Sequence, residues 1–151
     1  NHEGDYVCTD AEVRRMFADA EHDGNPQDAL IRKGFSVERD IDLPSVHQYR
    51  QLLSTVHPGH PWGSISNDSL FLEKIGAIAV DYSSGESGIT RASLLMFGKS
   101  DNITHLGGEP YYFVDYRERL YTDDPKVRWT DRIYPDGTWE ANFVSILSAC
   151  V

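Results

Sequence analysis

The sequence predicts an α+β fold in which about five helices pack on a small, mostly antiparallel sheet. Two observations support this prediction. Apolar residues recur with helical spacing in four segments between residues 13 and 97, whereas aromatic and β-branched residues predict strands in the C-terminal half, at 111–116 and 127–133. The 151 residues have the length of one ordinary domain, and they contain no internal repeat, low-complexity tract or clear linker. We therefore expect a single domain over residues 1–151.

The first predicted helix begins after Thr9. Thr9 and Glu12 have the spacing of a capping box, in which each side chain accepts a backbone N–H at the start of a helix. The apolar residues that follow make one side of the helix apolar: Val13, Met16, Phe17 and Ala20. Residues 24–26, Gly-Asn-Pro, would end the helix.

Three further helices are expected in the middle of the chain. Asp42 precedes a proline suited to a first turn, and this second helix would end at the Pro- and Gly-rich stretch 57–61. A third, short helix would span residues 67–75, and Gly76 would stop it. A fourth begins after Thr90, its predicted cap, and is apolar on nearly all sides, so we expect it to be a buried central element.

Strands are expected at four places. A short extended segment is predicted at residues 35–37, where two apolar residues alternate around a serine, and another strand at 78–82. Residues 111–116 are aromatic or β-branched on both sides, as in a central strand that is covered on two faces. Within 127–133, apolar and polar residues alternate as in a half-buried strand.

The stretch 128–143 joins this last strand to a last helix. Pro135, Asp136 and Gly137 favour a turn, because proline fixes φ, aspartate bonds its own backbone and glycine tolerates positive φ. We expect a helix to open at Thr138 and to turn one apolar side back onto the strand. That side would consist of Trp139, Phe143, Ile146 and Leu147.

The charge and the ends of the chain limit its partners. With 14 basic and 24 acidic residues the formal charge is −10, which repels phosphate backbones and anionic lipids on average. No apolar run reaches the roughly 20 residues that cross a bilayer, and no signal segment opens the chain, so we expect a cytoplasmic protein without a membrane partner. The chain begins at Asn1 without a methionine and ends within a helical pattern, which indicates a middle domain excised from a larger multidomain protein.

Four arginines are candidate nucleic-acid contacts: Arg117, Arg119, Arg128 and Arg132. They alternate with tyrosines and a tryptophan, so that guanidinium groups could meet phosphates while rings stack on bases. The other interpretation is an ion-pair network with acids of the same region, such as Asp115 and Asp131. The acidic composition favours the network, and nucleic-acid binding is the alternative.

Other reactive side chains give weaker indications. His57 and His60 have H-x-x-H spacing, but this loop lacks a cysteine or an evident third ligand for zinc. Cys8 and Cys150 are expected to be reduced structural thiols, and a disulfide between them stays open. Phosphate-loop and dinucleotide motifs are absent. We expect no catalytic residue, cofactor or metal in this chain, and a thiol- or metal-dependent hydrolase is the least favoured alternative.

Several segments, taken in order, are similar to one protein family. They are the helix of residues 9–17, residues 89–99 with their Phe-Gly-Lys end, 115–117, 128–133, and the Asp-Gly-Thr-Trp-Glu-Ala-Asn stretch 136–142. This pattern resembles the middle region of bacterial Schlafen-like, AlbA-like, divergent-AAA DNA-binding proteins, labelled transcriptional regulators or RecG-related ATP-dependent helicases. The resemblance implies an N-terminal AlbA-like domain that binds nucleic acid and a C-terminal ATP-binding region, and this chain lacks the motifs of both.

The resemblance leads to an expectation about function. The chain would be a non-catalytic connecting or interaction domain of such a regulator or helicase-like protein. Its partners would be neighbouring domains of the same polypeptide, with DNA bound through the absent N-terminal domain, and a homo-oligomer is left open. Binding or hydrolysis of ATP would belong to the parent protein.

Overall fold

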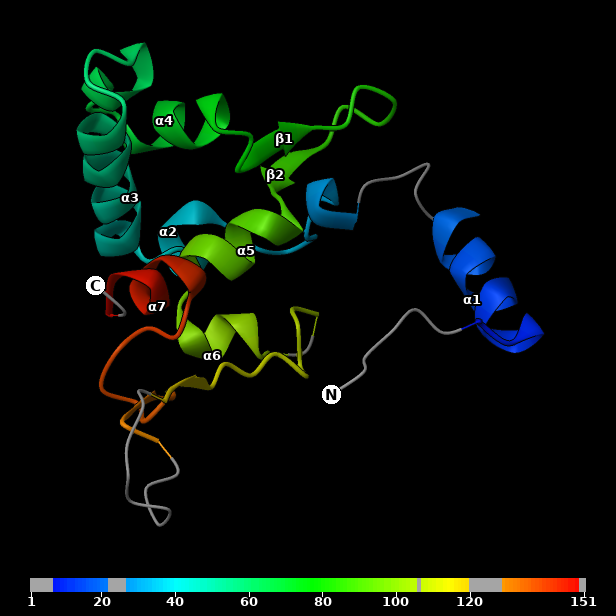
Figure 1. The fold of residues 1–151 in the computed structure, drawn as a ribbon. Coiled ribbons are helices and arrows are strands. Elements are labelled where there is room, and N and C mark those ends of the chain that lie inside the picture. The colour runs from blue at the N-terminus through cyan, green and yellow to red at the C-terminus, as the bar shows by residue number, and fades with distance from the viewer. Residues whose placement is uncertain (1–6, 22–26, 106, 120–128, 150–151) are drawn as a thin grey trace.

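The computed structural model describes residues 7–21, 27–105, 107–119 and 129–149. They form an α+β fold, as predicted, with helices around a core and two separate antiparallel strand pairs (Figure 1). The helices are α1 (Asp10–Glu21), α2 (Val37–Asp40), α3 (Leu43–Val56), α4 (Asp68–Lys74), α5 (Arg91–Phe97), α6 (Ser100–Ile103) and α7 (Phe143–Ala149), and short 3₁₀ turns lie at Gln27–Ala29 and Pro61–Ser64. The strands are β1 (Ile78–Val80), β2 (Ser87–Ile89), β3 (Tyr116–Glu118) and β4 (Asp131–Ile133).

Local capping sets where four helices begin, and all four starts were predicted. Thr9 and Glu12 form the capping box: the Thr9 N–H donates to the Glu12 carboxylate at 2.7 Å, and the Thr9 hydroxyl accepts the Glu12 N–H at 3.3 Å. Asp42, Asn67 and Thr90 each accept the N–H of the third residue beyond them, at the starts of α3, α4 and α5. These bonds satisfy N–H groups that have no partner within a helix.

The β1–β2 pair is extended by a third segment, residues 30–32. The Arg32 N–H donates to the carbonyl of Ile89 at 2.9 Å, and the Arg91 N–H donates to the carbonyl of Leu30 at 2.8 Å. This pairing joins the N-terminal part of the body to the start of α5. The predicted strand at 78–82 is confirmed as β1, but its sheet lies in the middle of the chain and is separate from the C-terminal pair.

The extended segment predicted at residues 35–37 is wrong. Gly34, with a φ of +82°, turns the chain just before it. Ser36 then starts α2, because its hydroxyl accepts the N–H of Arg39 and its own N–H donates to the Asp40 carboxylate at 2.6 Å. A serine that bonds nearby backbone groups in this way favours a helix start over a strand.

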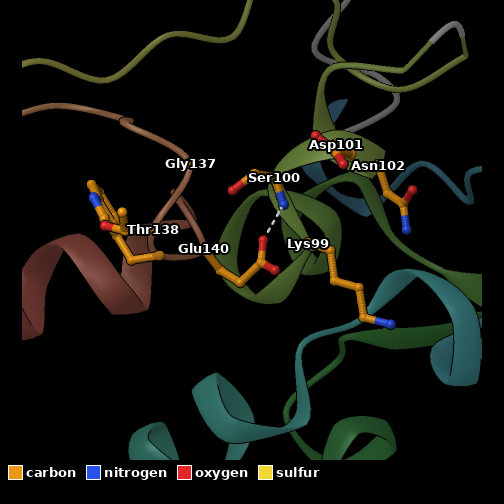
Figure 2. A pocket seen from close by; sticks show the side chains of 8 residues that line it. Lys99, Ser100, Asp101, Asn102, Gly137, Thr138 and Glu140 are labelled. Carbon is orange, nitrogen blue, oxygen red and sulfur yellow. Dashed lines mark hydrogen bonds between the residues drawn. The ribbon is translucent and has the colours of Figure 1, made fainter.

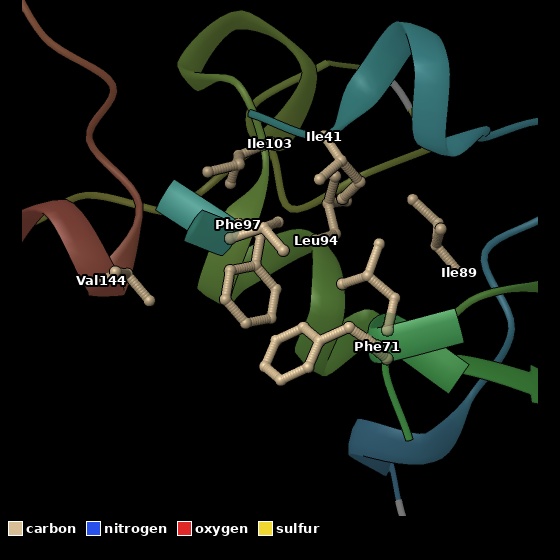
Figure 3. Close-up of a cluster of buried hydrophobic side chains, with 10 residues drawn as sticks. Ile41, Phe71, Ile89, Leu94, Phe97, Ile103 and Val144 are labelled. Carbon is tan, nitrogen blue, oxygen red and sulfur yellow. The ribbon is translucent and has the colours of Figure 1, made fainter. Parts of the chain in front are cut away.

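Helix α5 is the centre of the hydrophobic core, as its apolar sides predicted. Leu94 and Phe97 are buried, and Figure 3 shows both within a group of side chains from many elements. Tyr49 of α3 meets the Phe97 ring edge-on, with 5.5 Å between ring centres. The other buried members come from α3, α4, the α4–β1 turn, β2, α6, α7 and the α2–α3 junction: Ile41, Val46, Phe71, Leu72, Ala77, Ile89, Ile103 and Val144.

The central strand predicted at residues 111–116 is wrong. Tyr111 is 97% exposed and Phe113 is 69% exposed, and regular pairing begins only at Tyr116, in β3. Tyr112 packs against the core, and its hydroxyl donates to the carbonyl of Ala141 at 2.7 Å. The aromatic pattern resembled a doubly covered strand, but β3 has one neighbouring strand, β4, in a two-stranded sheet.

The last helix begins five residues later than predicted. The turn at residues 135–137 is followed by an irregular stretch, in which the Asp136 carboxylate accepts both the N–H and the hydroxyl of Thr138. α7 starts at Phe143, where Asn142 is its cap and accepts the Ser145 N–H at 2.9 Å. Side-chain bonds to the backbone therefore hold residues 136–142 out of the helix.

Helix α1 stands apart from the body of the fold (Figure 1). Its apolar side has the predicted spacing, yet Met16 is 62% exposed and Phe17 is 67% exposed. Val13, on the same side, is also exposed. In the part of the chain that the structure describes, no helix combines the length and apolar character that a membrane crossing requires.

Candidate functional site

The β3–β4 hairpin brings two of the predicted arginines together. The strand register places Arg117 directly opposite Arg132. Like charges that face each other across two strands repel, and Asp115 offsets this repulsion because it binds both. Its carboxylate accepts from Arg132 Nε at 2.9 Å and from Arg117 Nε at 2.7 Å. Arg117 and Arg132 are therefore both engaged in ion pairs, as the network interpretation expects.

Each of these guanidinium groups also lies over an aromatic ring. Arg117 is 4.8 Å from the centre of the Trp129 ring, and Arg132 is 5.0 Å from that of Tyr134. Such contacts are attractive because the ring face is electron-rich. Both rings are exposed. We call Arg117, Trp129, Arg132 and Tyr134 the Arg–aromatic face.

Asp115 stays ionised over a wide pH range. Hydrogen bonds from Arg132 and then Arg117 lower the pKa of this carboxyl to about 2, against its ordinary value of 3.8. The hydrogen bond that Arg132 donates to Asp115 raises the pKa of Arg132. Arg119 is exposed outside β3, and Arg128 lies outside the described residues. Of the four candidate arginines, the structure therefore places two in one surface.

A shallow cleft of about 360 Å³ lies where the stretch before α7 crosses the start of α6 (Figure 2). Two hydrogen bonds connect the two segments at this cleft. The Ser100 N–H donates to the Glu140 carboxylate, and the Ala141 N–H donates to the Ser100 hydroxyl at 2.7 Å. Lys99, on its rim, donates to the Arg39 carbonyl. The polar groups of this cleft hold α6 against the C-terminal stretch.

Asn142, two residues beyond Glu140, is the most buried polar side chain among the described residues, with 0% exposed surface. Its Nδ2 donates to the Ser45 hydroxyl at 2.9 Å and to the Gly98 carbonyl at 3.1 Å. Ser45 in turn donates to Asp42 at 2.6 Å. Asn142 therefore joins the starts of α3 and α7 to the end of α5. The Asn-x-x-Ser spacing at 142–145 is a capping signal that the sequence analysis missed.

Other charged clusters also join elements of the fold. Glu109 accepts from Arg91 Nε at 2.7 Å and pairs with Arg32. The pKa of Arg32 is lowered, first by burial and then by the neighbouring charge of Arg91. Asp68, at the start of α4, pairs with Arg50 and lies 3.0 Å from His47 Nε2, both on α3. These carboxylates connect elements of the fold.

His57, His60 and Cys8 take ordinary positions. His60 Nδ1 accepts the Trp62 N–H at 3.2 Å and so caps the turn Pro61–Ser64, whereas His57 is exposed at the end of α3. Cys8 is half-buried beside the α1 cap, and Cys150 lies outside the described residues. No three His, Cys, Asp or Glu side chains within the described ranges are grouped so that they could hold a metal ion.

The fold and its polar contacts define a small α+β domain in which charged side chains connect helices and hairpins. The chain belongs to the family described as a domain of unknown function, DUF8451, whose model matches residues 14–115. This range reaches from within α1 to Asp115, so all four residues of the Arg–aromatic face lie beyond it. No curated protein and no solved structure matches the chain.

Proposed function

We propose that this domain is a non-catalytic connecting and interaction domain of a bacterial, cytoplasmic DNA-binding transcriptional regulator or RecG-related helicase-like protein. Neighbouring domains of the same polypeptide are its partners, and DNA is bound by an N-terminal domain of the parent. The observation that carries this proposal is α1, a helix whose apolar side is exposed although it has the pattern of a packed surface.

Helix α1 needs a packing partner for physical reasons. It has 12 residues, and an isolated helix shorter than about 12–15 residues is only marginally stable in water. Its capping box stabilises the first turn, but the apolar side formed by Val13, Met16 and Phe17 gains nothing while it faces water. Recognition of a helix through residues spaced i, i+3, i+4 and i+7 is a common mode of protein interaction.

The polar contacts support a role without catalysis. Glu109, Asp68 and Asp115 are each held by two cationic or histidine side chains. Asn142 and Glu140 bond to groups from other elements. Side chains engaged in this way stabilise the placement of helices, and a connecting domain depends on that placement.

Hydrogen exchange tests the interaction role. The α1 amides should exchange more slowly in the full-length parent than in this chain alone, because a neighbouring domain covers the apolar side. Phe17→Ser should remove the difference, whereas Arg15→Gln, on the opposite side of α1, should keep it. Equal exchange in the parent and the isolated chain would contradict the proposal, and so would tight binding of ATP to this chain in a calorimetric titration.

The Arg–aromatic face favours a second candidate, a direct nucleic-acid-binding module. Arg117 and Arg132 lie opposite each other, and the exposed Trp129 and Tyr134 rings beside them could stack on bases. On this side of the hairpin two guanidinium groups share one carboxylate, whereas Glu118 and Asp131 lie opposite each other at the next position of the register. Single-stranded nucleic acid is the partner that this combination suits best.

Fluorescence anisotropy with labelled single-stranded DNA tests this candidate. Binding should weaken as salt rises, and Arg132→Ala should weaken it further and reduce the salt slope by about 1. Arg15→Ala, on α1, removes the same charge far from the face and is the control. Equal losses in both variants would show that only the overall charge matters.

A further inference from the structure

Strand β1 has one edge with which no other described segment of the chain pairs. The N–H of Asp81, just after β1, donates to the carbonyl of Glu86 at 2.8 Å, so Asp81 faces the β2 side. The bonding side alternates along an antiparallel strand. Ala79 therefore also faces β2, and the backbone groups of Ile78 and Val80 point away from it.

This edge lies on the outside of the fold. In Figure 1, β2 lies between β1 and α5. Residues 30–32 pair with the end of β2, whereas the outer side of β1 has no such neighbour among the described residues. The Val80 side chain is 48% exposed, and a groove of about 610 Å³ adjoins Ala79 and Val80. A second strand can therefore approach this edge.

Strand β1 lacks the features that commonly protect a free edge. Soluble proteins place a lysine, a proline or a bulge at such positions. Residues 78–80 are Ile-Ala-Val, without charge or proline, and they pair one to one with β2, so no bulge interrupts them. Two N–H groups and two carbonyl groups are thus left as a template for another strand.

We propose that two copies of this chain pair through β1, in antiparallel orientation, around a two-fold axis at Ala79. Ile78 of each copy then lies opposite Val80 of the other, and the two residues exchange both of their backbone bonds. The axis repeats this pair, so four bonds engage all the open groups of both copies. The β-branched side chains of Ile78 and Val80 also contact each other across the strands.

Charges at the two ends of β1 favour a second copy in this orientation. Lys74 ends α4, shortly before β1, and Asp81 follows β1 directly. Antiparallel pairing brings the lysine end of each copy toward the aspartate end of the other. Hydrogen bonds from Ser83 and Ser84 lower the pKa of Asp81 to about 2, so it is charged at neutral pH. The pairing uses neither α1 nor the Arg–aromatic face and is independent of the function proposed above.

Sedimentation equilibrium of the intact chain over a wide range of concentrations tests the pairing. Each copy carries a formal charge of −10, so the measurement needs about 0.15 M salt to screen the repulsion. A reversible equilibrium between monomer and dimer is the expected result.

Val80→Pro tests whether the dimer depends on this edge. The change removes an N–H that points away from β2, and an edge strand tolerates proline at such a position. It deletes two of the four bonds, so the dissociation constant of the dimer should rise roughly thirtyfold. Val80→Thr keeps the N–H and the branched shape and is the control. Slow exchange of the Ala79 amide, which faces β2, checks that the hairpin stays folded in both variants.

A disulfide tests the position of the axis. The axis places the two copies of Ala79 opposite each other, with their Cα atoms about 4.5 Å apart, which suits a disulfide. With Cys8 and Cys150 replaced by serine, Ala79→Cys should cross-link two copies under mild oxidation. Ser87→Cys, at an exposed position on β2, should not.

Three results would overturn the proposal. One is a chain that stays monomeric over the whole concentration range. Another is equal dissociation constants for Val80→Pro and Val80→Thr, which would assign the dimer to a different surface, such as the apolar side of α1. The third is a failure of Ala79→Cys to cross-link, which would exclude an axis at this residue.

Discussion

The side-chain amide of Asn142 donates to the hydroxyl of Ser45, 2.9 Å away, although 97 positions separate the two residues in the chain. The same amide nitrogen also binds the Gly98 carbonyl, and its oxygen caps α7 through Ser145. One buried side chain thus holds the start of α3, the end of α5 and the start of α7. This contact, with the bonds of Ser100 to Glu140 and Ala141, attaches the C-terminal stretch to the body.

Replacement of Asn142 by alanine should strongly destabilise the domain. The variant loses a helix cap and leaves buried polar groups without a partner, and each of these losses costs about 1–2 kcal/mol. We expect the free energy of unfolding to fall by about 3 kcal/mol in urea denaturation. Ser148→Ala, on the exposed side of α7, is the control. A loss for Asn142→Ala no larger than that of the control would show that the contact is not needed.

Leu94 should be the position on α5 most sensitive to truncation. It is fully buried and lies in the group of Figure 3, so Leu94→Ala removes contacts and leaves a cavity. The expected loss in the free energy of unfolding is about 2–5 kcal/mol. Leu147→Ala deletes the same atoms from an exposed side chain of α7 and should cost much less. Similar losses for both variants would place the core elsewhere.

Tyr112 should make the domain lose stability at alkaline pH. Burial raises the pKa of its hydroxyl from 10.0 to about 12. The protonated form is therefore favoured in the folded state, and its contribution is complete below pH 10 and is lost as pH rises from 10 to about 12. Thermal unfolding between pH 8 and 11.5 should show this decline.

Tyr112→Phe should flatten this decline, although it also removes the bond to Ala141 and so lowers stability at pH 8. Tyr111→Phe, at an almost fully exposed neighbour, should behave as the wild type does. A decline of unchanged steepness in Tyr112→Phe would assign the alkaline transition to other groups.

Asp115 should control the stability of the β3–β4 hairpin at acidic pH. Because its pKa in the folded state is about 2, against an ordinary value of 3.8, its stabilising effect is complete above pH 3.8 and is lost as pH falls toward 2. Asp115→Asn should mimic this loss at neutral pH, because Arg117 and Arg132 then face each other without an anion.

Hydrogen exchange of the hairpin amides measures the effect of this change. Exchange should accelerate in Asp115→Asn, and added salt should partly reverse the change by screening the arginines. Asp131→Asn is the matched control with the opposite sign, because Asp131 lies opposite Glu118 and its removal relieves a like-charge pair. Faster exchange in both variants would indicate a general need for acidic residues in the hairpin.

Four helix starts were predictable, whereas the exposure of the apolar residues in 111–116 and in α1 was not. Thr9, Asp42, Asn67 and Thr90 all cap helices as expected, since each cap bonds to the residue three positions on. Residues 111–116 have an apolar pattern as strong as that of α5, yet Tyr111 and Phe113 face outward. A pattern reports which side of an element is apolar, but it does not report what covers that side.

The same holds for the candidate sites, because a local pattern identifies residues but does not report which residues they contact. The four arginines could be found from the sequence. That Arg117 lies opposite Arg132, with Asp115 bound to both, depends on the strand register. Asn142 had only the weak signal of its capping spacing.

The sequence by itself determined the α+β class, the starts of α1, α3, α4 and α5, and the central apolar helix, because these depend on residues within about one helical turn of each other. Only the tertiary structure decided that the stretch before α7 is bound to α6 and α3, that the strands form two separate pairs and that α1 presents its apolar side. The first of these outcomes depends on the contacts of Ser100 with Glu140, 40 positions apart, and of Ser45 with Asn142. Bonds between such distant residues form only when the whole chain has folded, and no local pattern encodes them.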